Sequence, residues 1–341
     1  MKKPIAIIFN DAHLKPGNEE VVLSSVKHMI EVANEKGIKK FIFAGDLFDS
    51  RSFQRQSILL TLSKILRLFS LNGIESYFIP GNHDKTIYAS HDSFLDIFEH
   101  YPNFNSYTSL SIIDIEGVSI TMLPFFSDDM LIPMLKEAEP SDVLISHFEM
   151  AGSTNLGRTS EKTTINKELL SKWKKTYLGH YHNHHEITKD IVHLPSLRQA
   201  NFGEDNNKGF SVLYSDLSYE IIKGNFSEFL KIEIDLNSIT TTELKQLIKT
   251  HENSPNVIRF EFSGKESKLK ALDRSIFSDT GIDIKLKYDV KYNYDEEDLV
   301  YPTITERYQE SDVKDTFKQF CEDKGYDLKI GQALLEEFFN K

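Results

Sequence analysis

From Met1 to about Gly224 the chain alternates between short apolar runs and longer amphipathic stretches. Short apolar runs bounded by polar residues predict buried strands, and five of them are Ile5–Phe9, Lys40–Ala44, Ser76–Pro80, Asp142–Ile145 and Thr176–Leu178. Apolar residues at helical spacing predict helices over Glu19–Glu35 and Ser57–Leu71. Helices that connect successive apolar strands are typical of βαβ units, so these segments predict parallel pairing.

The pattern changes beyond Phe104 to shorter alternating strands. Glu116-Gly117 predicts a hairpin turn between strands at Ser111–Ile115 and Val118–Leu123, and Ser215-Asp216 predicts a second hairpin within Ser211–Ile222. Together these segments predict an α/β fold with a two-layered mixed β-sheet core flanked by helices. The expected limits of this first domain are residues 1–224.

Two further parts are predicted after a boundary at Lys223-Gly224-Asn225. Residues 225–291 show a strand–helix–strand–helix–strand pattern that predicts a small α/β capping domain; its segments are Leu230–Ile234, Thr242–Thr250, Asn256–Phe262, Glu266–Phe277 and Asp283–Asp289. Residues 292–341 begin with an acidic linker and continue with two amphipathic segments, 313–323 and 329–339. We interpret them as helices that bind a partner protein.

Composition limits where the protein acts and what it binds. The formal net charge of −12 argues against unaided binding to DNA, because affinity for the phosphate backbone relies on Lys and Arg. The single cysteine, Cys321, excludes an intrachain disulfide. No apolar run approaches the roughly 20 residues that span a bilayer, and Asn10 ends the first run before it reaches the length of an export signal. We therefore expect the protein to act in the cytoplasm.

Polar motifs follow all five apolar runs, and loops at the carboxyl ends of strands carry the chemistry of open α/β sheets. The motifs are Asp11-Ala12-His13, Gly45-Asp46-Leu47-Phe48-Asp49, Gly81-Asn82-His83-Asp84, Ser146-His147 and Gly179-His180-Tyr181-His182. Taken singly, each has an ordinary structural explanation, such as a capped turn or a histidine with a hydrogen-bond partner. Five such motifs in order favour a shared metal centre.

The residue types in these motifs suit two divalent cations. Asp11 and His13 can project from one loop toward one ion. The carboxylate of Asp46 offers two oxygens, which is the simplest way to bridge two cations roughly 3.5 to 4 Å apart. Because side chains alternate in an extended segment, His180 and His182 point to the same side. Histidine, carboxylate and amide oxygen without thiolate suit Mn²⁺, Fe or Zn²⁺, and the choice among them stays open.

With these residues in this order, the sequence resembles the calcineurin-like metallophosphoesterase superfamily, whose pattern is DxH, GDxxD, GNHD/E, H and GHxH. The resemblance covers about residues 5–203. Within the superfamily, the GDLFD of Gly45–Asp49, the GNHD and the following small domain look most like the nuclease subunit of SbcCD-type DNA repair and recombination complexes, including the bacteriophage recombination exonucleases.

The resemblance implies two divalent metal ions, with Mn²⁺ expected, and assigns a role to each motif. The implied ligands are Asp11, His13 and His182 at the first ion, Asn82, His147 and His180 at the second, and Asp46 between them. His83 is then a catalytic residue that donates a proton to the leaving oxygen, not a ligand. Asp49 is implied to be the carboxylate that orients His83 and raises its pKa.

The resemblance also implies a reaction and a partner. The reaction is exonucleolytic or endonucleolytic hydrolysis of phosphodiester bonds in DNA. The partner is an SbcC-type coiled-coil ATPase with a basic surface, in a heterotetramer that contains a homodimer of this chain. A phosphatase or cyclic-nucleotide phosphodiesterase of the same superfamily, and a non-catalytic scaffold, remain alternatives. Arg51 and Arg55 follow the second motif and are either phosphate ligands or ordinary solvated residues.

Overall fold

The structure is a computed structural model that describes residues 2–155, 158–159, 163, 165–288 and 317–318. The chain divides into two units, residues 1–288 and residues 289–341. Apart from Phe317 and Lys318, the second unit lies outside the described residues, and so do almost all of the predicted partner-binding helices. Among the described residues, no helix is both long enough and apolar enough to cross a membrane.

The first sheet contains six strands in the order β14-β13-β1-β2-β3-β4. Its strands are β1 (Pro4–Phe9), β2 (Lys40–Ala44), β3 (Glu75–Ile79), β4 (Phe104–Ser106), β13 (Gly209–Tyr214) and β14 (Tyr219–Lys223). Strands β1 to β4 are parallel, while β13 pairs antiparallel with β1 and β14. Helix α1 (Glu19–Lys36) connects β1 to β2, and helix α2 (Gln56–Leu71) connects β2 to β3. The predicted βαβ units are therefore present.

The second sheet also contains six strands, in the order β11-β12-β10-β7-β6-β5. Its strands are β5 (Ser111–Ile115), β6 (Val118–Leu123), β7 (Val143–His147), β10 (Lys175–Gly179), β11 (His185–Thr188) and β12 (Ile191–His193). The neighbours β6, β7, β10 and β12 are parallel, and the edge strands β5 and β11 are antiparallel. A small ribbon of β8 (Thr154–Asn155) and β9 (Arg158–Thr159) follows β7.

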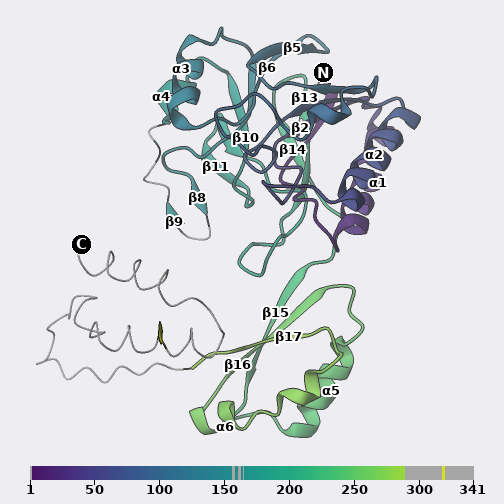
Figure 1. The fold of residues 1–341 in the computed structure, drawn as a ribbon, viewed down its shortest axis with the longest axis vertical. Coiled ribbons are helices and arrows are strands. Elements are labelled where there is room, and N and C mark those ends of the chain that lie inside the picture. Colours follow the sequence, from purple (N-terminus) through teal and green to yellow (C-terminus); the bar gives the residue numbers. More distant parts are fainter. Residues whose placement is uncertain (1, 156–157, 160–162, 164, 289–316, 319–341) are drawn as a thin grey trace, which may run out of the picture. The chain divides into compact units, whose positions relative to one another are not determined.

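Three hydrophobic cores arrange these elements in layers. Between the sheets, Ile8 and Ile42 from the first sheet pack in one cluster with Ile145 from the second. A second cluster packs α1 and α2 against the first sheet. A third packs α3 (Asp128–Glu137) and α4 (Lys167–Leu170) against the second sheet. The result is a helix–sheet–sheet–helix arrangement, with α1 and α2 on one side and α3 and α4 on the other (Figure 1). The predicted fold class is confirmed.

Residues 229–286 form a three-stranded parallel sheet in the order β15-β16-β17. Its elements are β15 (Phe229–Asp235), α5 (Thr241–His251), β16 (Val257–Ser263), α6 (Glu266–Lys270), the 3-10 helix η2 (Arg274–Phe277) and β17 (Asp283–Leu286). The predicted βαβαβ order is present, but the helix expected over Glu266–Phe277 is two shorter pieces. The break falls where the Asp273 side chain accepts a hydrogen bond from the amide of Ser275, which competes with helix continuation. A separate capping domain over 225–291 stays a prediction.

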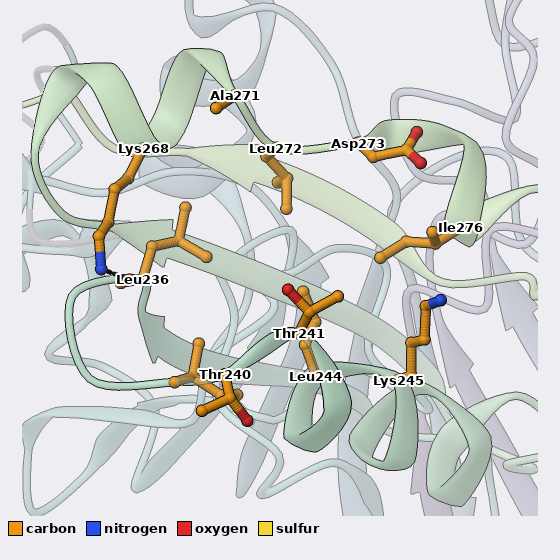
Figure 2. A pocket seen from close by; sticks show the side chains of 11 residues that line it. Leu236, Thr240, Thr241, Leu244, Lys245, Lys268, Ala271, Leu272, Asp273 and Ile276 are labelled. Carbon is orange, nitrogen blue, oxygen red and sulfur yellow. Dashed lines mark hydrogen bonds between the residues drawn. The ribbon is translucent and has the colours of Figure 1, made fainter.

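This smaller sheet has a hydrophobic core of its own, which includes Phe260, Phe262 and Leu269. Beside the core lies a cleft of about 330 Å³ between α5 and the segment that contains α6 and η2. Figure 2 shows Leu244 and Leu272 lining the cleft and Lys268 at one end, where its ammonium donates to the carbonyl of Leu236 at 2.8 Å. None of the residues that line the cleft belongs to the five motifs.

Candidate metal centre

The five motif loops converge at the carboxyl ends of strands from both sheets. The amide of Asp11, after β1, donates to the carbonyl of Gly45, after β2, at 2.9 Å. The ring of His147, at the end of β7, donates from Nδ1 to the carbonyl of Ala44 at 2.8 Å. The amide of His180, after β10, donates to Asp11 Oδ2 at 3.1 Å. These bonds tie the two sheet edges together around one buried site.

Three overlapping groups of side chains in this site could hold a metal ion. Within each group, one ligand atom from every residue lies within 4.8 Å of the others: Asp11, His13 and His182; Asp46, His147 and His180; and His13, Asp46 and His83. The first group consists of the three residues implied for the first ion. The second contains His147 and His180, which are implied for the second ion, together with Asp46, which is implied to lie between the ions. The third brings His83 within ligand distance as well, so its assignment as a non-ligand rests on its other contacts.

Asp46 lies between the first two groups. Its Oδ2 is 3.2 Å from Nε2 of His147 and 3.7 Å from Nε2 of His13. Oδ1 of Asp11 lies 3.7 Å from Nε2 of both His13 and His182. One carboxylate oxygen of Asp46 thus faces imidazoles from both ligand sets, which is the arrangement that a bridging ligand needs.

Hydrogen bonds at Nδ1 direct Nε2 of two histidines into the site. His147 donates from Nδ1 to the Ala44 carbonyl, and His182 donates from Nδ1 to Glu204 Oε1 at 2.8 Å. When such a ring is neutral, as it is in a metal ligand, its single proton stays on Nδ1 and its Nε2 lone pair is free to bind an ion. In metal sites generally, a histidine ligand donates a hydrogen bond from the ring nitrogen that does not bind the metal, and this bond fixes the tautomer of the ring.

Asn82 completes the second group. Its side-chain oxygen lies 3.2 Å from Nε2 of His147 and 3.0 Å from Nδ1 of His180. His180 therefore turns Nδ1 into the site, whereas His147 uses Nε2. The carboxylate, two imidazoles and amide oxygen come from four different loops.

The buried charges of the site strongly affect one another. Burial by itself would raise the pKa of Asp11 and of Asp46, but the neighbouring histidines lower both well below their usual value. Burial would lower the pKa of His147, yet the charges of Asp46 and Asp11 raise it to about 9. Burial and the charge of His147 lower the pKa of His180 to about 4. Two ionised carboxylates in the interior therefore require positive charge beside them.

The donor set fits divalent cations. Oδ1 of Asp11 is buried and has no hydrogen-bond partner among the described residues, which is costly unless it serves as a ligand. Nε2 of His13 and Nε2 of His182 lie 3.0 Å apart beside it. Carboxylate, imidazole and amide oxygen without thiolate are ligands for hard to borderline metals. Divalent cations would supply the positive charge that the carboxylates need.

The backbone around the site is strained. Four non-glycine residues in the motifs adopt positive φ values: Asp11 (49°), His13 (43°), Asp46 (59°) and His180 (87°). Such conformations cost free energy and persist at sites where the surrounding structure enforces them. Gly81 is needed for a different reason, since a Cβ at this position would collide with the side chain and amide of Asp46. The motif glycines thus allow the loops to approach closely.

The contacts of His83 differ from the expected ones. Nδ1 of His83 donates to the backbone carbonyl of Asp49 at 2.7 Å, and not to its carboxylate. The Asp49 side chain instead accepts from Lys15 Nζ at 3.2 Å. The expected rise in the pKa of His83 was also wrong, because burial of the imidazole lowers it. Asp49 orients the ring through its main chain.

Two buried residues that support the site carry no recognisable sequence signal. Glu204 accepts from His182, and also from the Asn201 side chain at 2.8 Å and the Ala200 amide at 3.1 Å. Arg198 donates to the carbonyls of Ala12 at 3.2 Å and His13 at 3.1 Å, which holds the first motif loop in place. Both come from the segment after β12.

The contact between Glu204 and His182 leads to a prediction. Glu204→Gln removes the charge that keeps the His182 proton on Nδ1, so we expect metal affinity to fall about 10- to 100-fold. Calorimetric titration of the metal-depleted protein with Mn²⁺ measures this change. Glu220→Gln is the matched control, because Glu220 lies exposed on β14. Equal affinities of the Glu204→Gln variant and the wild type would show that the carboxylate does not support the ligand.

Comparison with known proteins agrees with this geometry. The profile of the Calcineurin-like phosphoesterase family matches residues 6–208, which is more than half of the chain. The protein therefore belongs to the calcineurin-like phosphoesterase family. The matched range includes all five motifs, the whole second sheet, and strands β1 to β4 of the first sheet from Ala6 onward.

The individual proteins compared with this chain share low sequence identity with it, between 11% and 22%. The chain is 22% identical over 254 residues to "Exonuclease subunit 1" of Enterobacteria phage T4, which covers 71% of this chain and 74% of the relative. A solved structure described as a novel archaeal phosphodiesterase aligns with a TM-score of 0.31 and 14% identity, over 65% of this chain and 99% of the other. Another crystal structure aligns with a TM-score of 0.41 and 11% identity, over 66% of this chain and all of the other.

Proposed function

We propose that this protein is a two-metal-dependent nuclease that hydrolyses phosphodiester bonds in DNA, with Mn²⁺ as the expected metal. The observation that carries the proposal is the position of Asp46, whose Oδ2 faces His147 at 3.2 Å and His13 at 3.7 Å. A single carboxylate shared between two sets of imidazoles is typical of a two-metal phosphoesterase centre.

The proposed ligands follow from the two groups described above. Asp11, His13 and His182 would hold one ion, Asn82, His147 and His180 would hold the other, and Asp46 would be shared between them. Bound divalent ions lower the pKa of water and stabilise the charge that develops on the phosphoryl oxygens. The protein fixes the ligands through the Ala44 carbonyl, Glu204 and the strained loops.

His83 is the proposed catalytic residue outside the ligand sets. Its Nδ1 proton is held by the Asp49 carbonyl, which leaves Nε2 to face the site. The rings of His83 and His13 lie 4.8 Å apart at a right angle, so His83 lies beside a proposed ligand of the first ion. The negative charge of a bound phosphate favours the protonated ring, so with substrate present His83 would hold a proton at Nε2 and transfer it to the leaving oxygen.

DNA as the substrate rests on the exonuclease relative and on the sequence motifs. A net charge of −12 is unfavourable for DNA binding by this chain alone. We therefore propose that the protein acts in the cytoplasm with an SbcC-type coiled-coil ATPase, as a homodimer within a heterotetramer. Residues 225–291 would form the capping domain and residues 292–341 would bind the ATPase.

The substrate class can be tested directly. The purified protein with Mn²⁺ is incubated with end-labelled DNA, with p-nitrophenyl phosphate and with a cyclic nucleotide. We expect turnover of DNA to exceed that of the two small substrates. Turnover confined to the monoester or the cyclic nucleotide would identify a phosphatase or a cyclic-nucleotide phosphodiesterase instead.

The proposed role of the tail leads to a second prediction. Deleting residues 300–341 should leave metal-dependent hydrolysis of bis(p-nitrophenyl) phosphate intact, because every proposed ligand lies before Phe210. The same deletion should abolish association with the ATPase subunit, since apolar stripes at helical spacing fit a groove on another protein. Co-purification of both subunits measures the association. Full co-purification of the truncated chain would exclude the tail as the binding element.

A further inference from the structure

Arg51 places a guanidinium group directly beside the proposed catalytic histidine. One of its terminal nitrogens lies 3.0 Å from Nε2 of His83, and the other donates to the hydroxyl of Tyr88. The guanidinium carbon also lies 5.5 Å from the centre of the Tyr88 ring. Arg51 follows β2 and Tyr88 follows β3, so two neighbouring loops bring these groups together.

Other cations around the metal centre already have partners. Lys15 pairs with Asp49 at 3.2 Å. Lys208 is buried and donates to the His182 carbonyl at 2.6 Å, and Arg198 is buried against backbone carbonyls. Within the described part of the chain, Arg51 forms no ion pair with a carboxylate. Its exposed positive charge remains available to an anion.

The contact with His83 is one that a phosphate can replace. Guanidinium groups only donate hydrogen bonds, and Nδ1 of His83 already donates to Asp49, so Nε2 accepts from Arg51. An anionic phosphoryl oxygen is a stronger acceptor for arginine than a neutral imidazole nitrogen. Arg51 could turn from His83 to such an oxygen without losing its hydrogen bond to Tyr88. That exchange would free Nε2 of His83.

Aromatic contacts connect Arg51 to the other side of the metal centre. The Tyr88 ring meets Phe125 edge to face at 5.0 Å between ring centres. Phe125 in turn lies nearly parallel to the ring of His180, at 6.5 Å and 17°. Tyr88 is half-buried and is held by this packing. The hydroxyl that accepts from Arg51 therefore has a defined position relative to the metal ligands.

We propose that Arg51 binds a non-bridging oxygen of the scissile phosphodiester, and that Tyr88 is a positioning residue for its guanidinium. The proposal rests on the proposed function for the phosphodiester substrate, but it does not require that the substrate be DNA. Arg55, only four residues further along, provides an internal contrast. It precedes α2, its side chain is exposed, and no contact with any motif residue is found for it among the described residues.

The experiment compares Arg51→Ala, Arg51→Lys and Arg55→Ala with the wild type on bis(p-nitrophenyl) phosphate and on single-stranded DNA. We expect Arg51→Ala to lower kcat/KM about 100-fold on both substrates, which is typical for the loss of one donor to developing charge. Arg51→Lys should recover part of this loss, because it restores the charge but not the planar fork. Arg55→Ala should stay within about twofold of the wild type, as expected for an exposed side chain without contacts. Metal content, measured on each purified variant, should not change.

Tyr88 is tested by a double-mutant cycle. Tyr88→Phe keeps the ring but removes the hydroxyl, and we expect kcat/KM to fall about fivefold, as for the loss of one hydrogen bond. In the Arg51→Ala background the same change should have no further effect, since its partner is already gone. Full additivity of the two losses would show that Tyr88 does not act through Arg51.

Several outcomes would overturn the proposal. They are equal activity of the Arg51→Ala and Arg55→Ala variants, a loss confined to DNA, and a loss of metal from the Arg51→Ala variant. Bis(p-nitrophenyl) phosphate allows a failure of the Arg51 proposal to be distinguished from a failure of the nuclease proposal. If the wild type hydrolyses bis(p-nitrophenyl) phosphate but not DNA, the nuclease proposal fails while the role of Arg51 can still be measured.

Discussion

Asp46→Ala is expected to abolish phosphodiester hydrolysis. Asp46 is buried, and its carboxylate faces both imidazole groups of the metal centre. The change removes the proposed shared ligand of the two ions. Metal ions contribute several kcal/mol to the stabilisation of the transition state, so the rate should fall at least about 10³-fold. Steady-state hydrolysis of bis(p-nitrophenyl) phosphate and metal content per chain measure the two effects.

A matched aspartate separates this effect from a general effect of charge. Asp129 lies exposed in the first turn of α3 and belongs to none of the metal-binding groups. Asp129→Ala should therefore retain wild-type turnover and metal content. An Asp46→Ala variant with two bound ions and near wild-type activity would contradict the assignment of Asp46 as the shared ligand.

His83→Ala is expected to lower the rate about 10²- to 10⁴-fold while metal content stays the same, because a positioned general acid contributes that much. His91→Ala is the matched control. His91 follows the same motif, but it is exposed and contacts the carbonyl of Thr108 from Nδ1 at 2.8 Å. Single-turnover kinetics together with metal analysis separate the chemical step from metal binding.

Metal analysis of the His83→Ala variant also decides an ambiguity in the site. His83 lies within ligand distance of His13 and Asp46. Its Nε2 accepts from Arg51 in this structure, which favours a role outside the ligand sets. Loss of one ion from the variant would show that His83 is a ligand, and the proton-transfer role would then have to be abandoned.

The sequence predicted the fold well where the local pattern and the tertiary environment agree. Runs such as Lys40–Ala44 are apolar because the strand is covered on both faces, and this strand begins and ends as predicted. The same agreement explains the motif positions, since parallel strands bring their carboxyl ends to one edge of a sheet. The sequence did not predict that the two sheet edges meet. The structure shows this contact in the hydrogen bond from His147 to the Ala44 carbonyl.

Contacts made by the main chain or by distant residues were not predictable from the motifs. The orienting group for His83 is the Asp49 carbonyl, and no side-chain pattern reports the direction of a carbonyl. Glu204 reaches His182 from 22 residues away, in a loop whose composition is ordinary. The positive φ of Asp46 is likewise imposed by the packing of neighbouring loops. Tertiary contacts create all of these features, so a local sequence pattern does not reveal them.

We expect this chain to hydrolyse DNA only with divalent metal bound. The most direct measurement incubates the purified, metal-depleted protein with end-labelled duplex and single-stranded DNA, in the presence of EDTA or of added Mn²⁺. Cleavage should be absent with EDTA and restored by Mn²⁺, because the buried carboxylates and imidazoles of the site need the cations to act on a phosphate. Undiminished cleavage after exhaustive chelation, with metal analysis confirming that the protein holds no ion, would contradict the account.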